Sequence, residues 1–296
     1  MRAALIQEFG GPDVIGYEEV PRPVPGPGEV LVKVAGAAFN PSDIGARSGL
    51  LREVLGHEVP MVLGVDVSGT VAGEPVIGRL DRGGAMAEYT VAAADLLVRA
   101  PASIPLAEAA AIPVAGLTAW QAVHEHAEPV AGERVLINGA GGGVGMFAVQ
   151  LAKHAGAHVV ATASPRSADA ARRYGADQVV HYTEPSWADE IDGPVDAVLN
   201  LAPIAPAAAA RLLALLRPGG RLVSITGPVE PPEDAKVTAT HFVARNDTAQ
   251  LAALAGLVDT GKVRVEVAGT RAFSELADVH RAAAAGDLQG KIVLTP

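Results

Sequence analysis

A run of glycines near the middle of the chain constrains the fold more than any other feature. The apolar stretch Val135-Leu136-Ile137-Asn138 leads into Gly139-Ala140-Gly141-Gly142-Gly143-Val144-Gly145, and helical periodicity follows over residues 146–154. A β-type run over residues 158–162 completes a strand–turn–helix–strand unit. Ala140, Gly142 and Gly145 have the small-x-Gly-x-x-Gly spacing. This combination indicates a dinucleotide-binding turn.

Glycine suits such a turn because a diphosphate reaches backbone N–H groups only where no Cβ intervenes. The N-terminus of the following helix adds partial positive charge. The alternative is a flexible loop between a strand and a helix. That alternative leaves the patterns on both flanks of the turn unexplained.

The composition narrows the class of protein. The 296 residues are 49% hydrophobic, enough for about two domains of roughly 150 residues each. The net charge of −10 comes without a block of like charges, which argues against nucleic acid or a membrane as the main partner. No apolar run reaches the roughly 18 residues of a membrane span. The start at Met1 lacks a basic-then-apolar region, so we expect a cytoplasmic protein.

The pattern of elements divides the chain. Short β-type runs such as residues 29–35 and 65–71, separated by Pro and Gly, indicate a small all-β region in the first hundred residues. From residue 117 strands and helices alternate, which predicts a parallel, doubly wound sheet. The expected elements are residues 134–137, 146–154, 158–162, 168–174, 178–181, 197–201, 207–216 and 221–226. Gly156, Gly175 and Pro218-Gly219-Gly220 are expected to end helices.

The tail has a strand, a helix over residues 274–285 and a last strand over 291–295. It either extends the nucleotide-binding sheet or rejoins the β region. We also expect residues 221–226 to leave a sheet edge, because Gly227-Pro228 and a polar stretch to residue 236 follow. Pairing of that edge across a two-fold axis predicts a homodimer.

Several motifs, in order along the chain, resemble the zinc-free medium-chain dehydrogenase/reductase superfamily, and within it the quinone oxidoreductase-like enzymes. They are Asn40-Pro41-Ser42-Asp43 with Arg47-Ser48-Gly49, Gly64-Val65-Asp66-Val67-Ser68-Gly69, Leu117-Thr118-Ala119-Trp120, the glycine turn, and Gly290-Lys291-Ile292-Val293-Leu294. The resemblance implies an α/β protein with a GroES-like β-barrel domain over residues 1–112, completed by 264–296. A Rossmann domain would span 113–263, with the active site between the two.

The cofactor can be predicted from the residues after the second strand. An NAD site places an acid about 20 residues past the glycines, where it binds the ribose 2′-hydroxyl. Ser164 lies nineteen residues after Gly145, and Arg166 follows it. Serine does not repel a 2′-phosphate and arginine can pair with it, so NADPH is expected over NADH. Arg172 and Arg173 are rivals for the phosphate, and Arg166 is alternatively a solvated surface charge.

The resemblance also implies a set of cofactor-binding residues. Tyr182, at the end of the third strand, would lie against the adenine, or else is an ordinary strand-end aromatic. Phe242-Val243 would pass beside the nicotinamide. With the turn and the phosphate-binding pair, the predicted set is Thr118, Gly139, Ala140, Gly142, Gly143, Val144, Gly145, Ser164, Arg166, Tyr182, Phe242 and Val243.

A metal site is the main alternative for the chemistry. Gly56-His57-Glu58 copies the triplet in which zinc-dependent relatives hold zinc through histidine. In those relatives a cysteine stands where Asn40 stands, and this chain has no cysteine, so neither a thiolate zinc site nor a disulfide can form. We expect His57 to be a polar loop residue. His124 and His126 are two residues apart, which favours surface positions over a joint ligand pair.

Without a metal, the expected chemistry is hydride transfer to a small hydrophobic quinone or α,β-unsaturated carbonyl compound, whose oxyanion is delocalised. Asn40 is predicted to lie near the nicotinamide or the substrate oxygen, with Asp43 beside it. Alternatively, both only order the turn before the next helix. The runner-up functions are a zinc-independent carbonyl or alcohol oxidoreductase, and a crystallin-like NADPH-binding protein with a structural or regulatory role.

Two departures from the family affect these expectations. Gly45 and Ala46 stand where similar quinone reductases often carry a tyrosine, which leaves the proton donor unassigned. The segment between Gly69 and Glu88 is shorter than in relatives. A trimmed barrel edge there would open the active-site cleft and change substrate access.

Overall fold

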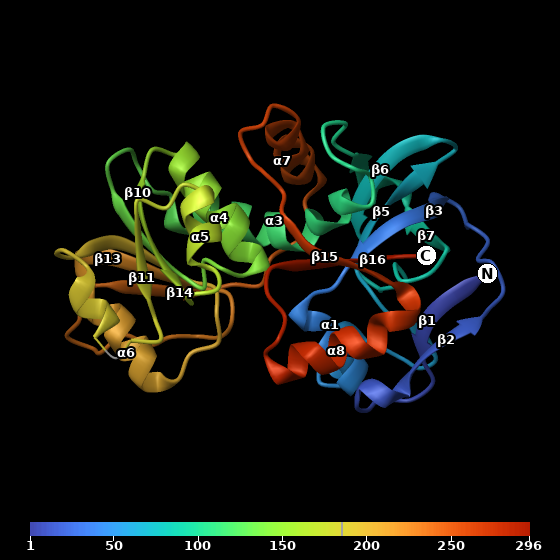
Figure 1. The fold of residues 1–296 in the computed structure, drawn as a ribbon, viewed down its shortest axis with the longest axis horizontal. Coiled ribbons are helices and arrows are strands. Elements are labelled where there is room, and N and C mark those ends of the chain that lie inside the picture. The colour runs from blue at the N-terminus through green and yellow to red at the C-terminus, as the bar shows by residue number, and fades with distance from the viewer. Residues whose placement is uncertain (185) are drawn as a thin grey trace. The chain divides into compact units, whose positions relative to one another are not determined.

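The computed structural model describes residues 1–184 and 186–296, which form two compact units (Figure 1). The first comprises Met1–Val114, Asn246–Thr260 and Val265–Pro296, and the second comprises Ala115–Arg245 and Gly261–Arg264. Among the described residues, the longest helices have twelve residues each. No helix in that part of the chain is long and apolar enough to cross a bilayer.

The first unit is built on two β-sheets. A three-stranded sheet has the order β2-β1-β4, and a larger sheet runs β15-β16-β3-β5-β6-β8, with β7 paired to β3. The strands are β1 (Arg2–Ile6), β2 (Ile15–Glu19), β3 (Glu29–Ala38), β4 (Met61–Val62), β5 (Asp66–Val71), β6 (Glu74–Arg79), β7 (Tyr89–Ala93), β8 (Leu97–Arg99), β15 (Val267–Ala272) and β16 (Lys291–Thr295). The helices of four or more residues are α1 (Pro41–Ser48), α2 (Arg52–Leu55), η3 (Glu108–Ala111), α7 (Thr248–Asp259) and α8 (Leu276–Ala285).

The C-terminal tail rejoins the β region of the first unit and does not extend the nucleotide-binding sheet. Strand β16 pairs antiparallel with β3, with Val293 opposite Ala38, and β15 then pairs parallel with β16. Val293 and Ala38 are fully buried, so this pairing lies in the core. Figure 1 shows the red tail strands beside the blue strand β3. The tail thus completes the first unit, as predicted for the GroES-like domain, but the N-terminal region is not all-β, because helices α1 and α2 lie within it.

The short segment between Gly69 and Glu88 contains a hairpin. Strands β5 and β6 are antiparallel and are joined by Ala72 and Gly73, both with positive φ (51° and 92°). Positive φ at both central residues is the geometry of a type I′ turn, which matches the twist of paired strands. The segment therefore keeps a strand, β6, which also pairs with β8.

Helix α7 groups with the first unit, which differs from the expected division at residues 113–263. Asp259, at its end, accepts hydrogen bonds from the backbone N–H groups of Ala102 (2.7 Å) and Ser103 (2.9 Å). Before the helix, the amide of Asn246 donates to the carbonyl of Arg79 (2.9 Å). These partners are 157 and 167 residues away in the chain, so local pattern gives no sign of them.

The second unit is a doubly wound sheet, as the alternation of elements predicts. All its strands are parallel, in the order β11-β10-β9-β12-β13-β14, the 3-2-1-4-5-6 order of a dinucleotide-binding fold. The strands are β9 (Arg134–Asn138), β10 (His158–Ala163), β11 (Gln178–His181), β12 (Val195–Asn200), β13 (Leu216–Ser224) and β14 (Thr238–His241). The helices are α3 (Pro113–Gln121), which starts in the first unit, a π-helical turn (Ala122–Ala127), α4 (Gly143–His154), α5 (Ala168–Arg173), the short η5 (Trp187–Glu190) and α6 (Pro206–Ala214).

Two expectations about this sheet are wrong. Strand β13 is not a sheet edge, because β14 pairs with it over four residues, and β14 forms the edge instead. Helix α6 already ends at Ala214, and Pro218-Gly219-Gly220 lie within β13. There the register with β12 shifts, so these residues form a bulge rather than a helix stop.

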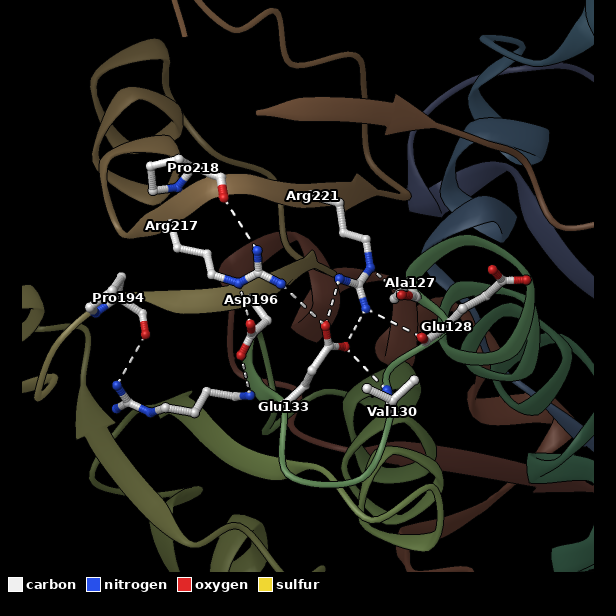
Figure 2. Close-up of polar contacts among 10 residues, drawn as sticks. Ala127, Glu128, Val130, Glu133, Pro194, Asp196, Arg217, Pro218 and Arg221 are labelled. Atoms are coloured by element: carbon white, nitrogen blue, oxygen red, sulfur yellow. Dashed lines mark hydrogen bonds and ion pairs between the residues drawn. The ribbon is translucent and has the colours of Figure 1, made fainter. Parts of the chain in front are cut away.

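An ion-pair network ties the amino ends of β9, β12 and β13 together (Figure 2). The guanidinium of Arg221 bonds the carboxylate of Glu133 at 2.6 Å. Asp196 accepts the backbone N–H of Arg134 at 2.7 Å and pairs with Arg217. This network lies at the opposite ends of the strands from the glycine turn, so its role is to fix strand register.

Candidate active site

The glycine turn connects β9 to α4 in the second unit. Gly139 has φ +90°, a left-handed conformation that favours glycine. The N–H of Gly142 donates to the carbonyl of Gly139 (3.1 Å), and Gly142 is the N-cap of α4. The helix therefore starts at Gly143, three residues before the expected start. The first amides of α4, those of Gly143 and Val144, have no acceptor within the helix and are suited to a diphosphate.

Gly142 and Gly145 serve different purposes. A Cβ on Gly145 would lie 2.4 Å from the carbonyl oxygen of Gly139 and 2.5 Å from that of Ala140, so a glycine is required for the helix to pack on the turn. A Cβ on Gly142 would have only the Gly139 oxygen nearby, at 3.4 Å. The space beside Gly142 is thus open, as close approach of a cofactor diphosphate requires. The turn fits a dinucleotide.

A row of buried polar side chains joins the carboxyl ends of four neighbouring strands. The hydroxyl of Thr162 donates to the Oδ1 of Asn138 (2.9 Å), whose Nδ2 donates to the Oδ1 of Asn200 (2.8 Å). The Nδ2 of Asn200 donates in turn to the hydroxyl of Ser224 (3.2 Å). The row also reaches the glycine turn, because the N–H of Gly139 donates to Thr162 (3.1 Å).

Our sequence reasoning missed this row, although its signal is present. Thr162, Asn138, Asn200 and Ser224 each stand at or near the end of an apolar strand. Because the carboxyl ends of parallel strands meet at one edge, polar residues there come together. The row crosses the point between β9 and β12 where the strand order reverses, which is where doubly wound folds bind their ligands.

The candidate phosphate-binding cations Arg166 and Arg172 differ in their contacts. Ser164 directly follows β10, with its hydroxyl 3.1 Å from that of Ser167. Arg166 is exposed and has no hydrogen bond or ion pair with any residue in the described part of the chain. Arg172, a rival, is already paired with Asp169 at 2.8 Å. Arg166 is therefore available to a ligand, whereas Arg172 is engaged.

The remaining predicted cofactor residues lie in the second unit as well. Tyr182 follows β11 and is 53% exposed. Phe242 follows β14 and packs on His126, with ring centroids 4.2 Å apart, while Val243 is 81% exposed. Thr118 is buried on α3. The contacts of these four residues with a cofactor stay predictions.

Asn40 and Asp43 lie in the first unit at the start of α1. Asn40 is the N-cap, and its backbone N–H donates to the Oδ2 of Asp43 (2.7 Å). The Asn40 amide donates to Asp66 (2.9 Å), and its Oδ1 accepts from the ammonium of Lys291 (2.8 Å). All four side chains are buried. The pair thus orders the turn, and a role of Asn40 or Asp43 toward substrate stays a prediction.

The cluster holds two carboxyl groups and one ammonium group out of water. Asp66 also accepts the backbone N–H of Val114 (2.8 Å) and lies 3.5 Å from Lys291. Burial raises the pKa of Asp66, and Lys291 and these donors oppose the rise. Burial raises the pKa of Asp43 from 3.8 to about 7, and the negative charge of Asp66 adds to the effect. Asp43 therefore holds a proton more readily than an exposed aspartate does, because one ammonium group faces two carboxyl groups.

The Asp43→Asn variant is expected to lose the fall in stability that Asp43 contributes between about pH 4 and pH 7. Folded protein keeps the Asp43 proton that the unfolded chain releases above 3.8. The contribution of Asp43 to wild-type stability is thus largest below about pH 4 and falls as pH rises, by ~4 kcal/mol at most at about 1.4 kcal/mol per pH unit. Urea unfolding across this range measures the slope. An equally steep slope in the variant would contradict the assignment.

The histidines do not gather into a metal site. His57 follows α2 and is 7% exposed, so the expected polar loop residue is in fact buried, and burial lowers its pKa. His124 packs on Trp120 and His126 on Phe242. Both are half-buried, so the surface positions expected for them are wrong. Within residues 1–184 and 186–296 no three His, Cys, Asp or Glu side chains are placed to hold a metal ion.

Two family models match the chain. The alcohol dehydrogenase GroES-like domain matches residues 26–102, and a model described as zinc-binding dehydrogenase matches residues 174–294. The words "zinc-binding" in the second description do not apply to this chain, because it has no cysteine to serve as the zinc ligand that the zinc-dependent enzymes use.

Curated relatives match over the full length of the chain. A chloroplastic quinone oxidoreductase of Triphysaria versicolor is 32% identical, covering 100% of this chain and 98% of the relative. A chloroplastic NADPH-dependent alkenal/one oxidoreductase of Arabidopsis thaliana is 31% identical, covering 100% and 80%. Among solved structures, the quinone oxidoreductase of Coxiella burnetii has a TM-score of 0.89 at 30% identity, covering 100% of this chain and 99% of the other.

Proposed function

This chain belongs to the quinone oxidoreductase-like group of the medium-chain dehydrogenase/reductase superfamily, and on that premise we propose that it is an NADPH-dependent reductase of quinones or α,β-unsaturated carbonyl compounds. The observation that carries the proposal is the glycine turn, which is open beside Gly142 and lies at the carboxyl edge of an all-parallel sheet. The whole length of the chain also matches a reductase of such compounds. The nicotinamide cofactor follows from the family and the fold.

The choice of NADPH rests on the residues after β10. The amides of Gly143 and Val144 would hold the diphosphate, and Arg166 and Ser164 would hold the 2′-phosphate. No acid stands between Thr162 and Ser167 to take the 2′-hydroxyl of NADH. The unpaired Arg166 supports the same choice.

The chain's part in the reaction is to bind, orient and exclude water. When bound, NADPH supplies the hydride. A conjugated acceptor is already polarised at the carbon that receives the hydride, and its oxyanion is delocalised, so the protein needs no Lewis acid. The lack of cysteine supports a metal-independent reaction.

We also propose that the protein is a homodimer that pairs through β14. Strand β14 is the edge of the second unit's sheet and three of its four residues are exposed. Such an edge offers free backbone N–H and C=O groups to a second copy. Sedimentation at micromolar concentration tests this pairing, and a monomer would contradict it. Cytoplasmic residence stays a prediction for cell fractionation.

The function is tested by following NADPH oxidation with a quinone, a conjugated enone and a saturated ketone, each with and without a chelator. We expect chelator-insensitive turnover of the quinone or the enone and none of the saturated ketone. Turnover of the saturated ketone would favour a carbonyl oxidoreductase. NADPH binding without turnover of any acceptor would favour a binding protein of structural or regulatory role.

A further inference from the structure

A large apolar groove runs along the second unit, outside the residues assigned to the cofactor. Its volume is about 780 Å³, within the roughly 300–1,000 Å³ of small-molecule pockets. One wall is α6, which contributes Ala209, Ala210 and Leu213, and the other is the segment 226–237, which contributes Val229 and Val237. The groove therefore lies within one compact unit, between a helix and the connection from β13 to β14.

The walls of the groove are fixed by packing and hydrogen bonds. Val229, Val237 and Leu213 pack against the buried core of the second unit. The backbone N–H of Gly219, in the bulge of β13, donates to the carbonyl of Lys236 (2.5 Å). The segment 226–237 is thus held to the sheet at both ends, and the groove is a feature of the fold.

The groove leads to the polar row at the strand ends. Asn200 and Thr226 line it, and the Nδ2 of Asn200 donates to the hydroxyl of Thr226 (3.1 Å). Thr226 in turn donates to the carbonyl of Ala202 (3.2 Å). The glycine turn and Arg166 lie on the first half of the sheet, so the adenosine belongs there. The nicotinamide then belongs on the second half, with β12 and β13.

The chemistry of the lining selects the occupant. Alanine, leucine, isoleucine, valine and proline make up most of it. The charged side chains along it are Glu230, Asp234 and Lys236, a net charge of −1, and all three are exposed. An apolar lining with this charge disfavours an anionic ligand such as a fatty acid carboxylate. It favours a neutral hydrocarbon chain.

We propose that this groove binds the neutral alkyl tail of the substrate, so that the preferred acceptor is an enone or quinone with a long apolar substituent. The inference rests on the proposed function for the reactive head of the substrate. The tail lies between α6 and the segment 226–237, and the conjugated carbonyl lies at the Asn200 and Thr226 end.

The test uses a series of alk-1-en-3-ones from but-3-en-2-one to undec-1-en-3-one with NADPH. We expect kcat/KM to rise about fourfold for each methylene added, until the groove is filled. In Ala210→Trp the indole fills the groove, so kcat/KM should no longer rise with the length of the chain. Ala207→Trp, on an exposed position of α6 that does not line the groove, is the matched control and should keep the rise.

A second measurement separates this inference from the proposed function. The saturated ketone 2-undecanone should raise the melting temperature of wild type and of Ala207→Trp, but not of Ala210→Trp. If 2-undecanone raises the melting temperature but no enone is turned over, the proposed function is contradicted and the binding of an alkyl chain in the groove is supported. Turnover that does not depend on tail length, or no shift with 2-undecanone, would overturn the inference. A further outcome is a melting temperature of wild type alone that rises with protein concentration and not with ketone. That result would show that a second copy of the chain occupies the groove, and it would also overturn the inference.

Discussion

Gly145→Ala is expected to destabilise the protein by about 3 kcal/mol or more and to abolish measurable NADPH binding. The added methyl carbon would lie 2.4 and 2.5 Å from two backbone carbonyl oxygens of the turn. Backbone atoms cannot move aside as the end of a flexible side chain can, so α4 must shift away from β9. Urea unfolding and titration with NADPH measure the two losses.

Two further glycines provide controls for this prediction. Gly142→Ala makes only an ordinary contact at 3.4 Å, so stability should change by less than ~1 kcal/mol while NADPH binds at least about tenfold more weakly. Gly256→Ala, at an exposed position inside α7, meets nothing within 4 Å, so it should leave NADPH binding unchanged and stabilise the protein by about 0.5–1 kcal/mol. Wild-type stability of Gly145→Ala would refute the close packing of helix on turn. Wild-type NADPH affinity of Gly142→Ala would place the diphosphate elsewhere.

Arg166→Ala is expected to raise the KM for NADPH by about 10- to 100-fold and to leave the KM for NADH unchanged. A charge-assisted bond to a phosphate contributes about 1.5–3 kcal/mol, which is this range in affinity. The exposed Arg166 has no partner among the described residues, so its removal should not alter stability. Steady-state kinetics with both cofactors measure the ratio.

Arg172→Ala is the matched control for Arg166→Ala. Its guanidinium is held by Asp169 at 2.8 Å on the same helix, so both cofactors should behave as with wild type. A selective loss of NADPH in Arg172→Ala, with Arg166→Ala unchanged, would move the phosphate to the rival cation. Equal losses for NADH and NADPH in Arg166→Ala would remove the basis for cofactor choice.

The sequence predicted those parts of the site that are local in the chain. The glycine turn lies within one strand–turn–helix unit, and residues 178–181 and 291–295 are strands with the bounds expected. Hydrophobic period and glycine spacing carry this information because the interacting residues are neighbours in sequence.

The parts that the sequence did not reveal depend on distant partners. The ammonium of Lys291 donates to the Oδ1 of Asn40 from 251 residues away, so local pattern gives no sign of the network that holds Asn40. The polar row required the order of the strands, which brings Asn138 beside Asn200. The groove depends on the path of the segment 226–237. Its proline-rich sequence has no regular spacing of hydrophobic residues from which that path could be predicted.

The most direct test of the central claim is the fate of the hydride. NADPH carrying deuterium at both C4 positions of the nicotinamide should be oxidised with oct-1-en-3-one, and the product examined by mass spectrometry and NMR. The account predicts a saturated ketone with one deuterium on the carbon β to the carbonyl, formed equally with a chelator present. An allylic alcohol with deuterium at the carbonyl carbon, or no deuterated product, would contradict it.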